Sequence, residues 1–407
     1  MPLRMKQLSA TDQKLLEPID QQRMLARVQG WAAINSGTGN LAGLAQMGEQ
    51  LAEAFSALPG DVTLREAEPV VTIDQDGHAV EKAHGRHLVL SVRPEAQRRF
   101  LLTGHMDTVF AAEHPFQDQT WLDADTLNGP GTADMKGGIA IIAEAPMAFE
   151  GAPGARSVGY DVMINSDEET GSLASARLIS ELAQGKAAAL TYEPSALPDG
   201  TLAHARGGSG NYALTFTGRS AHAGRNPHEG RNALVAAADC VMRLKAMQHS
   251  DLPINPARID GGSANNVVPD HAVLRFNIRP KTTHAGLDFI SDLKDLLELL
   301  QLQHEVTIHC HGGITRPPKP VDERAQRLFD LVRDTGALLG QEIGWMPSGG
   351  VCDGNNIAAA HVPVVDTMGV RGGAIHSPDE FMIVSSLTQR AQLSTLVLHR
   401  LASGAQL

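Results

Sequence analysis

The sequence predicts an α/β fold in which one domain is interrupted by a smaller α+β domain. A chain of 407 residues is too long for one ordinary hydrophobic core, so two domains are expected. Strand-like and helix-like runs alternate up to residue 206 and again from residue 316, which is typical of an α/β layer. Between these limits the predicted order is strand, helix, strand, strand, helix, strand, as in a ferredoxin-like unit.

The N-terminal part of the first domain is expected to be helical. Residues 11–58 carry apolar side chains at helical spacing, and the loop-like stretch NSGTGN divides them into two helices. Four strand-like runs follow, namely VTLREAEPVVTI, HLVLSV, RFLLTG and GYDVMIN, with helical patterns at 137–149 and 171–184. This alternation predicts a sheet that helices cover on both faces.

The predicted insert begins near residue 207, at GGSGNYALTFTG. Its helices are expected at 232–247 and 285–300, and its last two strands at AVLRFNIRP and EVTIHCH. The chain then returns to a helix at 321–339, a strand-like run HVPVVDTMG and a last helix at 383–401. We therefore expect a first domain formed by residues 1–206 and 316–407, and an insert formed by residues 207–315.

The charge and the cysteine content indicate which partners and which cellular compartment suit this protein. The net charge is −12, from 46 acidic and 34 basic residues, which argues against a nucleic-acid partner because phosphate binding needs clustered Lys and Arg. No apolar run approaches the length of a membrane span, and the first residues lack the apolar segment of a signal peptide. Three widely spaced cysteines argue against a disulfide framework and favour a reducing, cytoplasmic setting.

Five segments bring potential metal ligands to the ends of strand-like runs. They are LLTGHMDTVF with His105, NGPGTADMKGG with Asp134, INSDEETG with Glu169, LTYEPS with Glu193 and GVRGGAIHSPDE with His376. Ligands of open α/β sheets gather at the carboxyl ends of strands, so we expect these side chains to meet. Nitrogen and carboxylate ligands without cysteine suit zinc, with cobalt or manganese as alternatives. A buried cluster of five polar groups without a metal would be costly, which favours the joint interpretation.

Each segment alone has a simpler interpretation. A His-x-Asp pair such as His105 and Asp107 is common by chance, and Asp134 could be the N-cap residue of a helix after a glycine-rich turn. Three consecutive acids at 167–169 usually form a solvated loop. At the carboxyl end of a strand, however, neighbouring acids can divide the work, one binding a metal ion and the next acting on water.

Seven motifs, taken in order, resemble those of one di-zinc peptidase and deacylase family. They are HMDT, GTADMKGG, SDEETGS, YEPS, GRSAHAGRNPHEGRNAL, NVVP and AIHSPDE, and they span residues 100–390. The family includes aminoacylase, acetylornithine deacetylase, succinyl-diaminopimelate desuccinylase and the glutamate carboxypeptidases (carboxypeptidase G). The run SGGVCDGNNIAAA and the glutamate at position 193 are most similar to the glutamate carboxypeptidase branch. The stretch SALPDGTLAHARGGSG departs from that branch, in a region that forms part of the substrate pocket.

The resemblance implies a metal-binding role for five residues. Asp134 would bridge two zinc ions, with His105 and Glu193 completing one site and Glu169 and His376 completing the other. The peptide bond after Asp134 is expected to be cis. The first domain would then be the catalytic zinc-peptidase domain, with a mixed, mostly parallel sheet covered by helices.

The same resemblance assigns catalytic and substrate-binding residues. Glu168 would be the general base, and Asp107 would orient the neighbouring histidine ligand. The insert would be a lid and dimerisation domain, from which His222 would reach the active site of a partner subunit and stabilise the oxyanion. Asn266 and Arg279 match positions that bind the carbonyl and the carboxylate of the substrate. Read alone, these three residues could be an exposed histidine, a turn residue and the partner of a surface acid.

The implied activity is that of a zinc-dependent two-metal hydrolase that cuts an amide bond in a small, carboxylate-bearing substrate. The first reading is a glutamate-carboxypeptidase-like metallopeptidase that releases a C-terminal amino acid from a small peptide. The second is an N-acyl-amino-acid deacylase of the acetylornithine deacetylase or aminoacylase type. The third, a non-catalytic binding protein with the same fold, is disfavoured because every ligand and the base are present. We expect a homodimer formed through the insert, without nucleic-acid or membrane partners.

Overall fold

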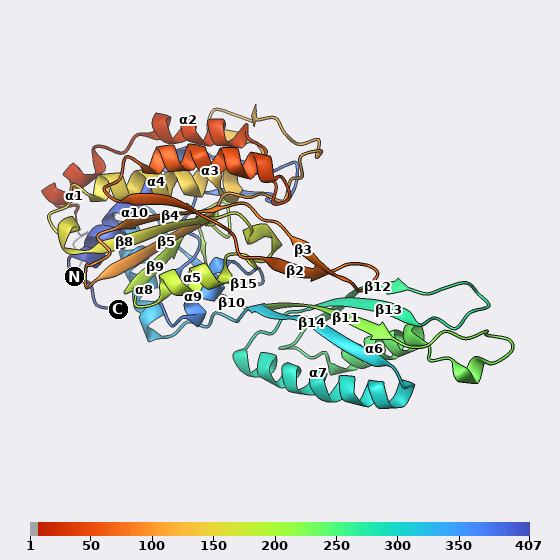
Figure 1. Cartoon of the computed structure of the whole chain (residues 1–407). Helices are drawn as coiled ribbons and strands as arrows, with labels where there is room; N and C mark the ends of the chain where they lie inside the picture. The colour runs from red at the N-terminus through yellow and green to blue at the C-terminus, as the bar shows by residue number, and fades with distance from the viewer. Residues whose placement is uncertain (1–6) are drawn as a thin grey trace.

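The computed structural model describes residues 7–407, which fold into a larger and a smaller part (Figure 1). Residues 1–6, which belong to the predicted first domain, lie outside the described residues. The larger part contains a six-stranded sheet with helices on both sides, and it carries both the first described residues and the C-terminus. The smaller part extends away from it and contains a four-stranded sheet with two helices (Figure 1).

The elements of the larger part come from both ends of the chain. Its helices are α1 (Ala10–Leu16), α2 (Gln21–Ala32), α3 (Leu41–Phe55), α4 (Gly137–Phe149), α5 (Ala176–Ala183), α8 (Glu323–Leu338), α9 (Asp353–Ala359) and α10 (Ser385–Ala402). Its central strands are β1 (Asp61–Arg65), β4 (His87–Val92), β5 (Arg99–His105), β8 (Gly159–Asn165), β9 (Ala188–Thr191) and β16 (Val364–Val365). Smaller sheets are formed by β2 (Val70–Ile73) with β3 (Ala79–Lys82), by β10 (Leu202–Arg206) with β15 (Trp345–Ser348), and by β6 (Thr120–Trp121), β7 (Thr126–Asn128), β17 (Gly372–Gly373) and β18 (Phe381–Ile383).

The central sheet is mixed and mostly parallel, in the order β1-β4-β8-β5-β9-β16. β1 pairs antiparallel with β4, and β4 with β8, whereas β8, β5, β9 and β16 run parallel. Parallel neighbours require crossover connections, and these place α4 and α5 over the faces of the sheet. The carboxyl ends of β8, β5 and β9 therefore open on one edge, where ligands of such sheets bind.

Side chains that alternate along the central strands pack on opposite faces of the sheet. Leu102 and Val162 belong to the larger core, together with α2, α3, α4 and α10. Leu101 and Met163 belong to a second core, under α5 and α9. This is the two-residue period of a strand, and it explains why buried strands such as HLVLSV read as nearly continuous apolar runs. Figure 1 shows α2, α3 and α4 on one side of the sheet and α5 and α9 on the other.

The smaller part has its own sheet and its own core. Its elements are β11 (Ser209–Thr217), α6 (Ala233–Met247), β12 (Ile254–Gly261), β13 (His271–Ile278), α7 (Thr283–His304) and β14 (Thr307–Arg316). The strands pair antiparallel in the order β12-β13-β11-β14. Phe216, Leu274 and Phe289 lie in a core between this sheet and the two helices. Element order and pairing match the ferredoxin-like unit that the sequence predicts.

A hairpin of the larger part, formed by β2 and β3, contacts the sheet of the smaller part. Arg275 donates hydrogen bonds to the carbonyl oxygens of Ile73 and Asp74, at 3.1 and 2.7 Å. Nε2 of His311 lies 2.9 Å from the carbonyl oxygen of Val71. These bonds join the two parts away from the two points, before β11 and after β14, where the chain passes from one part to the other. Figure 1 shows the hairpin reaching toward β12.

The predicted fold class is confirmed, whereas one detail of the helices differs. Residues 11–58 form three helices instead of two, because the chain breaks between α1 and α2. Pro18 lies in this break. A proline disfavours helical backbone at the preceding residue and cannot donate the helical hydrogen bond, so the pattern of apolar residues alone missed the interruption.

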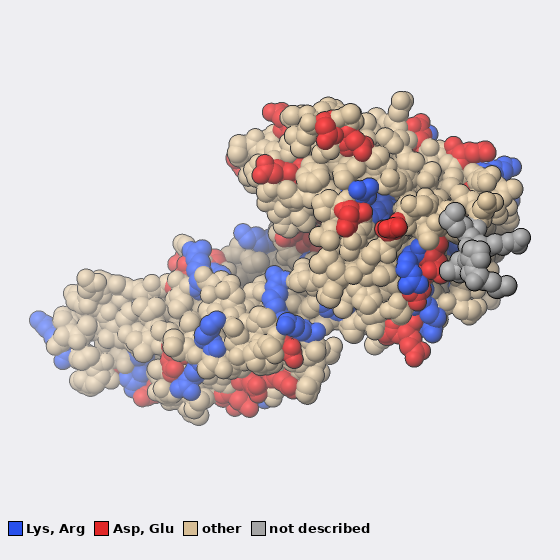
Figure 2. All heavy atoms as spheres, turned by 180° about the vertical axis from the view of Figure 1, so that it is seen from behind, with Lys and Arg blue, Asp and Glu red and all other residues tan. Residues whose placement is uncertain are grey.

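The surface carries both signs of charge. On the face that Figure 2 shows, Lys and Arg side chains are interspersed with Asp and Glu over both parts of the molecule. Across residues 7–407, no helix combines the length and the apolar composition that crossing a membrane requires.

Candidate two-metal centre

Three neighbouring strands of the central sheet deliver predicted site residues to one edge. β5 ends at His105, β8 is followed by Glu168 and Glu169, and β9 is followed by Glu193. These strands lie side by side in the order β8-β5-β9 and run parallel. Their carboxyl ends therefore bring four side chains, distant in the sequence, to one place.

The other two predicted ligands reach this place by a different route. Asp134 lies in a tight turn, η1 (Thr132–Lys136), that leads into α4, and its peptide bond with Met135 is cis. His376 follows β17, a strand of the small four-stranded sheet. We expected all five ligands to follow strand-like runs, but Asp134 is presented by a turn, and His376 is not presented by the central sheet.

The turn that carries Asp134 is held by a buried carboxylate. Glu380 accepts hydrogen bonds from the backbone N–H groups of Gly131, Ala133 and Asp134, at 3.1, 2.9 and 3.0 Å. Burial raises the pKa of Glu380 to about 7, and the nearby carboxylate of Asp134 adds to this effect. The three amides fix the backbone of the turn and thereby the direction of the Asp134 side chain.

The five predicted ligands form two groups that share Asp134. Oδ1 of Asp134 lies 3.1 Å from Nε2 of His105, which is 3.6 Å from Oε2 of Glu193. Oδ2 of Asp134 lies 3.2 Å from Nε2 of His376, which is 3.2 Å from Oε2 of Glu169. In each group the possible ligand atoms lie within 4.8 Å of one another. The two oxygens of one carboxylate thus face two separate sets of ligands, as in a bridging ligand.

The chemistry of this cluster fits a pair of divalent cations. Oε1 of Glu193 is buried and has no hydrogen-bond partner. Burial raises the pKa of Glu193, and it raises the pKa of Glu169 to about 7 with help from the carboxylate of Asp134. Hydrogen bonds with Asp134 and Glu169 raise the pKa of His376 to about 10. Carboxylates crowded in a buried site need positive charge, and His with Asp and Glu is a ligand set typical of zinc.

Asp107 supports both the ligands and the predicted base. The side chain of His105 points its Nδ1 at Asp107, 3.0 Å from the carbonyl oxygen and 3.4 Å from Oδ1. The carboxylate of Asp107 also accepts hydrogen bonds from the backbone N–H groups of Glu168 and Glu169, at 3.1 and 3.2 Å, and from Thr38 at 2.7 Å. It therefore orients the ring of one ligand and fixes the loop that carries another.

Glu168 is buried beside an arginine from the last strand of the smaller part. Oε1 of Glu168 lies 2.7 Å from Nη2 of Arg316, which also donates to the carbonyl oxygen of Glu168 and to Oγ of Ser172. Burial raises the pKa of Glu168 well above its usual range, although Arg316 opposes the shift. Asp353 is the second carboxylate near this guanidinium, at 3.5 Å. Glu168 is not part of either ligand group.

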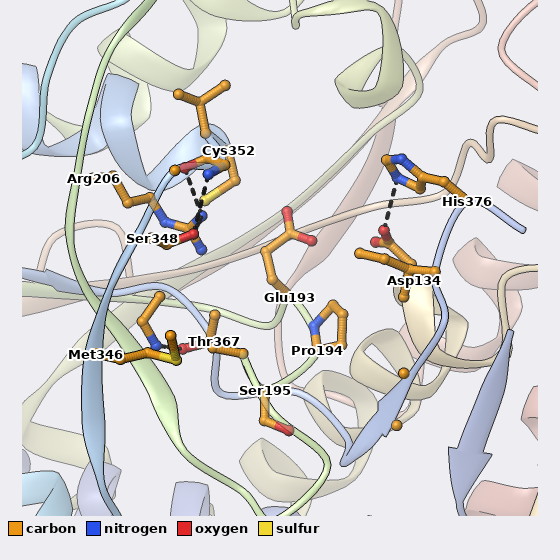
Figure 3. Close-up of a pocket in the computed structure, with 18 of the residues that line it drawn as sticks. Asp134, Glu193, Pro194, Ser195, Arg206, Met346, Ser348, Cys352, Thr367 and His376 are labelled. Carbon is orange, nitrogen blue, oxygen red and sulfur yellow. Dashed lines mark hydrogen bonds and ion pairs between the residues drawn. The ribbon is translucent and has the colours of Figure 1, made fainter. Parts of the chain in front are cut away.

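A cavity of about 570 Å³ adjoins the cluster. Figure 3 shows Glu193 between a group formed by Arg206, Ser348 and Cys352 and the pair of Asp134 and His376. Apolar and small residues form much of its wall, among them Pro194, Ala196, Pro198, Met346, Ile375 and Phe381. Four of the predicted metal ligands, Asp134, Glu169, Glu193 and His376, therefore line a pocket that is large enough for a small organic group.

Arg206, in the wall of this cavity, is committed to other partners. It forms an ion pair with the buried Asp366, at 2.8 Å, and its Nη1 donates to Ser348 and Gly350. Lys319 binds the same carboxylate of Asp366 at 3.0 Å. The guanidinium is therefore a structural group that holds β10, β15 and the segment after β16 together.

Three predicted residues lie elsewhere. His222, Asn266 and Arg279 are exposed residues of the smaller part, and none of them lines the cavity beside the ligand cluster. Nδ1 of His222 accepts hydrogen bonds from the N–H groups of Gly224 and Arg225, and Nε of Arg279 donates to Asn277. One copy of the chain does not bring these three side chains to the cluster.

Two residues of the centre were not predicted. Arg316 ends the run EVTIHCHGGITR, and nothing in its local pattern distinguishes it from a surface arginine at a strand end. Glu380 directly follows AIHSPD in the matched motif, so its position gave a signal, but an acid after a loop reads as a solvated residue. Both contacts join segments more than 100 residues apart in the sequence.

Comparisons with known proteins agree with this architecture. A model of peptidase family M20/M25/M40 matches residues 101–400. Carboxypeptidase G2 of Pseudomonas sp. (strain RS-16) is 28% identical over 399 residues, covering 95% of this chain and 91% of that protein. Succinyl-diaminopimelate desuccinylase of Maricaulis maris (strain MCS10) is 28% identical over 337 residues, covering 75% of this chain and 82% of that protein. The crystal structure of aminopeptidase PepT from Bacillus cereus ATCC 10987 superposes with a TM-score of 0.71 at 20% identity, covering 94% of this chain and 99% of that one.

Proposed function

This chain belongs to peptidase family M20/M25/M40, and from that premise we propose that it releases a C-terminal amino acid from a small, carboxylate-bearing peptide or acyl amino acid. The family resemblance and the metallohydrolase class predicted from the sequence are confirmed by the family match and by the relatives. The observation that carries the proposal is the pair of ligand groups that share Asp134.

We assign the metal-binding roles residue by residue. His105, Asp134 and Glu193 would hold one cation, and Asp134, Glu169 and His376 the other. The histidine and carboxylate donors support zinc, with cobalt or manganese as alternatives. When bound, two such ions would supply Lewis-acid polarisation of a carbonyl and would lower the pKa of water.

The remaining steps are carried by side chains of this chain. Glu168 would take the proton of the attacking water and return it to the leaving amine, since it belongs to neither ligand group and its side chain lines the cavity, which that of Asp107 does not. Asp107 would hold the ring of His105 in the orientation that presents Nε2 to the cation. Arg316 would hold the carboxylate of Glu168 in place through their ion pair.

The residues that line the cavity favour a substrate whose acyl group is uncharged. Arg206 is the only Lys or Arg among the lining residues described, and Asp366 and two oxygen acceptors already occupy its guanidinium. Met346, Ile375 and Phe381 offer apolar contact instead. A succinyl group would bring a carboxylate into a wall without a free cation, so desuccinylation is the less favoured reaction.

We propose that residues 1–206 and 316–407 act as the catalytic domain and residues 207–315 as a lid and dimerisation domain. In a homodimer, His222 of the partner subunit would stabilise the oxyanion. Asn266 and Arg279 would bind the carbonyl and the free carboxylate of the substrate, the latter because a guanidinium matches a carboxylate. All three side chains are exposed, which leaves them available for such a role.

A reducing, cytoplasmic setting completes the proposal. Cys240, Cys310 and Cys352 are all unpaired, as expected for a protein kept in a reducing compartment.

Hydrolysis of a substrate panel tests the proposal. The panel pairs benzoyl, acetyl and succinyl groups and single amino acids with glutamate and with an uncharged amino acid, in the presence of zinc, cobalt or manganese. We expect a higher kcat/KM for benzoyl groups and single amino acids than for acetyl and succinyl groups, in each case on an amino acid with a free carboxylate. The Glu168→Ala protein serves as the blank. Equal rates with amidated substrates would contradict the carboxylate requirement, and preference for succinyl substrates would contradict the assignment of the acyl pocket.

The second candidate is an N-acyl-amino-acid deacylase, and the same cavity supports it. Its small residues near the ligands, such as Gly372 and Ala374, leave room for an acyl group that is not an amino acid. The panel separates the two functions, because a deacylase would cut acetyl amino acids faster than dipeptides with the same C-terminal residue.

A further inference from the structure

A second cavity lies outside the metal centre, where the segment after Glu193 meets α10. It measures about 260 Å³ and is lined by Asp199, Gly200, Gln341, Arg371 and Arg390, among others. Arg371 lies just before β17, on the segment that leads to His376, and Arg390 lies on α10. The cavity therefore places two guanidinium groups together in one small space.

Arg390 is buried without a charged partner. Its exposed fraction is 2%, and its Nη2 donates to the carbonyl oxygen of Gly200 at 2.8 Å. Its Nη1 is buried and has no hydrogen-bond partner. Burial, reinforced by the neighbouring charge of Arg371, lowers the pKa of Arg390 to about 10. A buried cation with an unmatched donor is costly unless an anion or ordered water meets it.

Arg371 is held by neutral groups only. Its Nε donates to the carbonyl oxygen of Pro198 at 2.8 Å, and its Nη1 lies 3.4 Å from Oε1 of Gln389. Within residues 7–407, neither Arg371 nor Arg390 forms an ion pair with Asp or Glu. Both arginines keep N–H groups that do not bond to any protein acceptor. Because the two guanidinium groups carry like charges, each disfavours the charged form of the other.

The acids at the rim do not neutralise this pair. Asp199 and Glu342 line the cavity, but both are exposed. Oδ1 of Asp199 accepts a hydrogen bond from the N–H group of Thr201. The pKa of Asp199 is lowered mainly by hydrogen bonds from Thr201, and the charges of the two guanidinium groups contribute less. The inner part of the cavity therefore stays positively charged.

We propose that this cavity binds a small oxyanion, such as inorganic phosphate, sulfate or a free carboxylate, between the guanidinium groups of Arg371 and Arg390. The planar fork of N–H donors in arginine matches the oxygens of these ions. The volume accommodates one such ion together with several waters. The segment 194–200 and Arg371 would be joined through the ion as well as through Pro198.

Thermal unfolding of the metal-loaded protein tests the site. Inorganic phosphate, sulfate and acetate are titrated separately at constant ionic strength, with chloride as the reference ion. We expect a saturable rise of the unfolding temperature, of about 1–3 °C, for at least one oxyanion. Comparing the three ions distinguishes tetrahedral inorganic ions from carboxylates. Isothermal titration calorimetry with the same ions then gives the stoichiometry.

Four variants separate this site from the metal centre, which also attracts anions. Arg390→Met and Arg371→Gln should each weaken the apparent affinity for the oxyanion at least tenfold. Asp199→Asn should strengthen this affinity several-fold, because it removes a negative charge. Arg333→Gln, an exposed arginine on α8, is the matched charge control and should bind as the original protein does. If Arg390→Met does not fold, the half-buried Arg371→Gln carries the test alone. The proposal is overturned if the original protein shows no saturable shift, or if both arginine variants retain it, because water then satisfies Nη1 of Arg390.

Discussion

Nη2 of Arg316 lies 2.7 Å from Oε1 of Glu168, and both side chains are buried. Arg316 is the last residue of β14, so it belongs to the strand by which the chain leaves the smaller part. Glu168 follows β8 of the central sheet. The proposed base is therefore held by a residue whose position depends on how the smaller part is placed, and Arg316 joins the two parts through buried ion pairs with Glu168 and Asp353.

Replacing Arg316 by methionine is expected to lower kcat by about 10- to 100-fold, because a displacement of the base by about 1 Å has that effect. KM should change less, since Arg316 lies among protein groups rather than in the cavity wall. Both metal ions should be retained, which inductively coupled plasma spectrometry would verify. Arg316→Lys keeps the charge and should recover part of kcat. An unchanged kcat in Arg316→Met would show that Glu168 is positioned without this partner.

Replacing Glu168 by glutamine is expected to lower kcat by about 10²- to 10⁴-fold, the usual contribution of a general base. The amide keeps the shape of the side chain but cannot take a proton. Metal content should match that of the original protein, because Glu168 belongs to neither ligand group. The control is Glu181→Gln, an exposed acid on α5, which should leave kcat unchanged. Retained turnover together with retained metal would remove the base assignment.

Removing the metals with a chelator is expected to abolish hydrolysis and to lower the unfolding temperature, because buried carboxylates then lose their counter-charge. Asp134→Asn should bind far less than one ion per chain, since its side chain belongs to both groups. Glu193→Gln and Glu169→Gln should each retain about one ion, as each removes a ligand from only one site. Equal metal loss in all three variants would contradict a shared ligand.

Stability at low pH should depend on the ion pair between Asp12 and Arg400, at 2.8 Å, which ties α1 to α10. Burial favours the neutral acid, but hydrogen bonds from Arg400 and Ser9 outweigh it and lower the pKa of Asp12 to about 2. A carboxyl group with a lowered pKa stabilises the folded state fully above its ordinary pKa of about 3.9 and loses this effect as the pH falls toward 2.

The measurement is the free energy of unfolding by urea for the original protein and for Asp12→Asn. We expect a difference of about 1–2 kcal/mol at pH 6 that becomes smaller as the pH falls from 5 to 3. A difference that does not depend on pH would mean that Asp12 acts through packing alone. Arg324→Gln, on the exposed side of α8, is the control and should follow the original protein.

The sequence predicted those parts of the site that are encoded locally. A buried strand followed at once by polar residues, as at His105 and Glu169, is visible in a short window of sequence, and the sheet then brings these windows together. Asp134 was predicted from its glycine-rich surroundings, although a turn rather than a strand presents it. Arg316 was missed because its partner lies far away in the chain and no local pattern marks it, whereas Glu380 stands in a matched motif but reads as a solvated acid until its distant partners are known.

The positions of His222, Asn266 and Arg279 could not be inferred from one chain. Their motifs are recognisable, but each residue lies in the smaller part, outside the central sheet that brings the predicted metal ligands together. Physical reasoning from strand order applies within a sheet and does not extend across an interface between copies.

Mixing two inactive variants tests whether a partner subunit supplies His222. Glu168→Ala lacks the base, and His222→Ala lacks the proposed oxyanion donor, so each homodimer should be inactive. In a mixed dimer, the site that keeps Glu168 would receive His222 from the other chain and would be complete. Random mixing makes half of the dimers mixed, each with one complete site, so about a quarter of the original activity should return. Activity should appear only after the chains have been unfolded and refolded together, or co-expressed. Its absence under those conditions, with dimers verified by light scattering, would mean that His222 acts in its own chain or takes no part in the reaction.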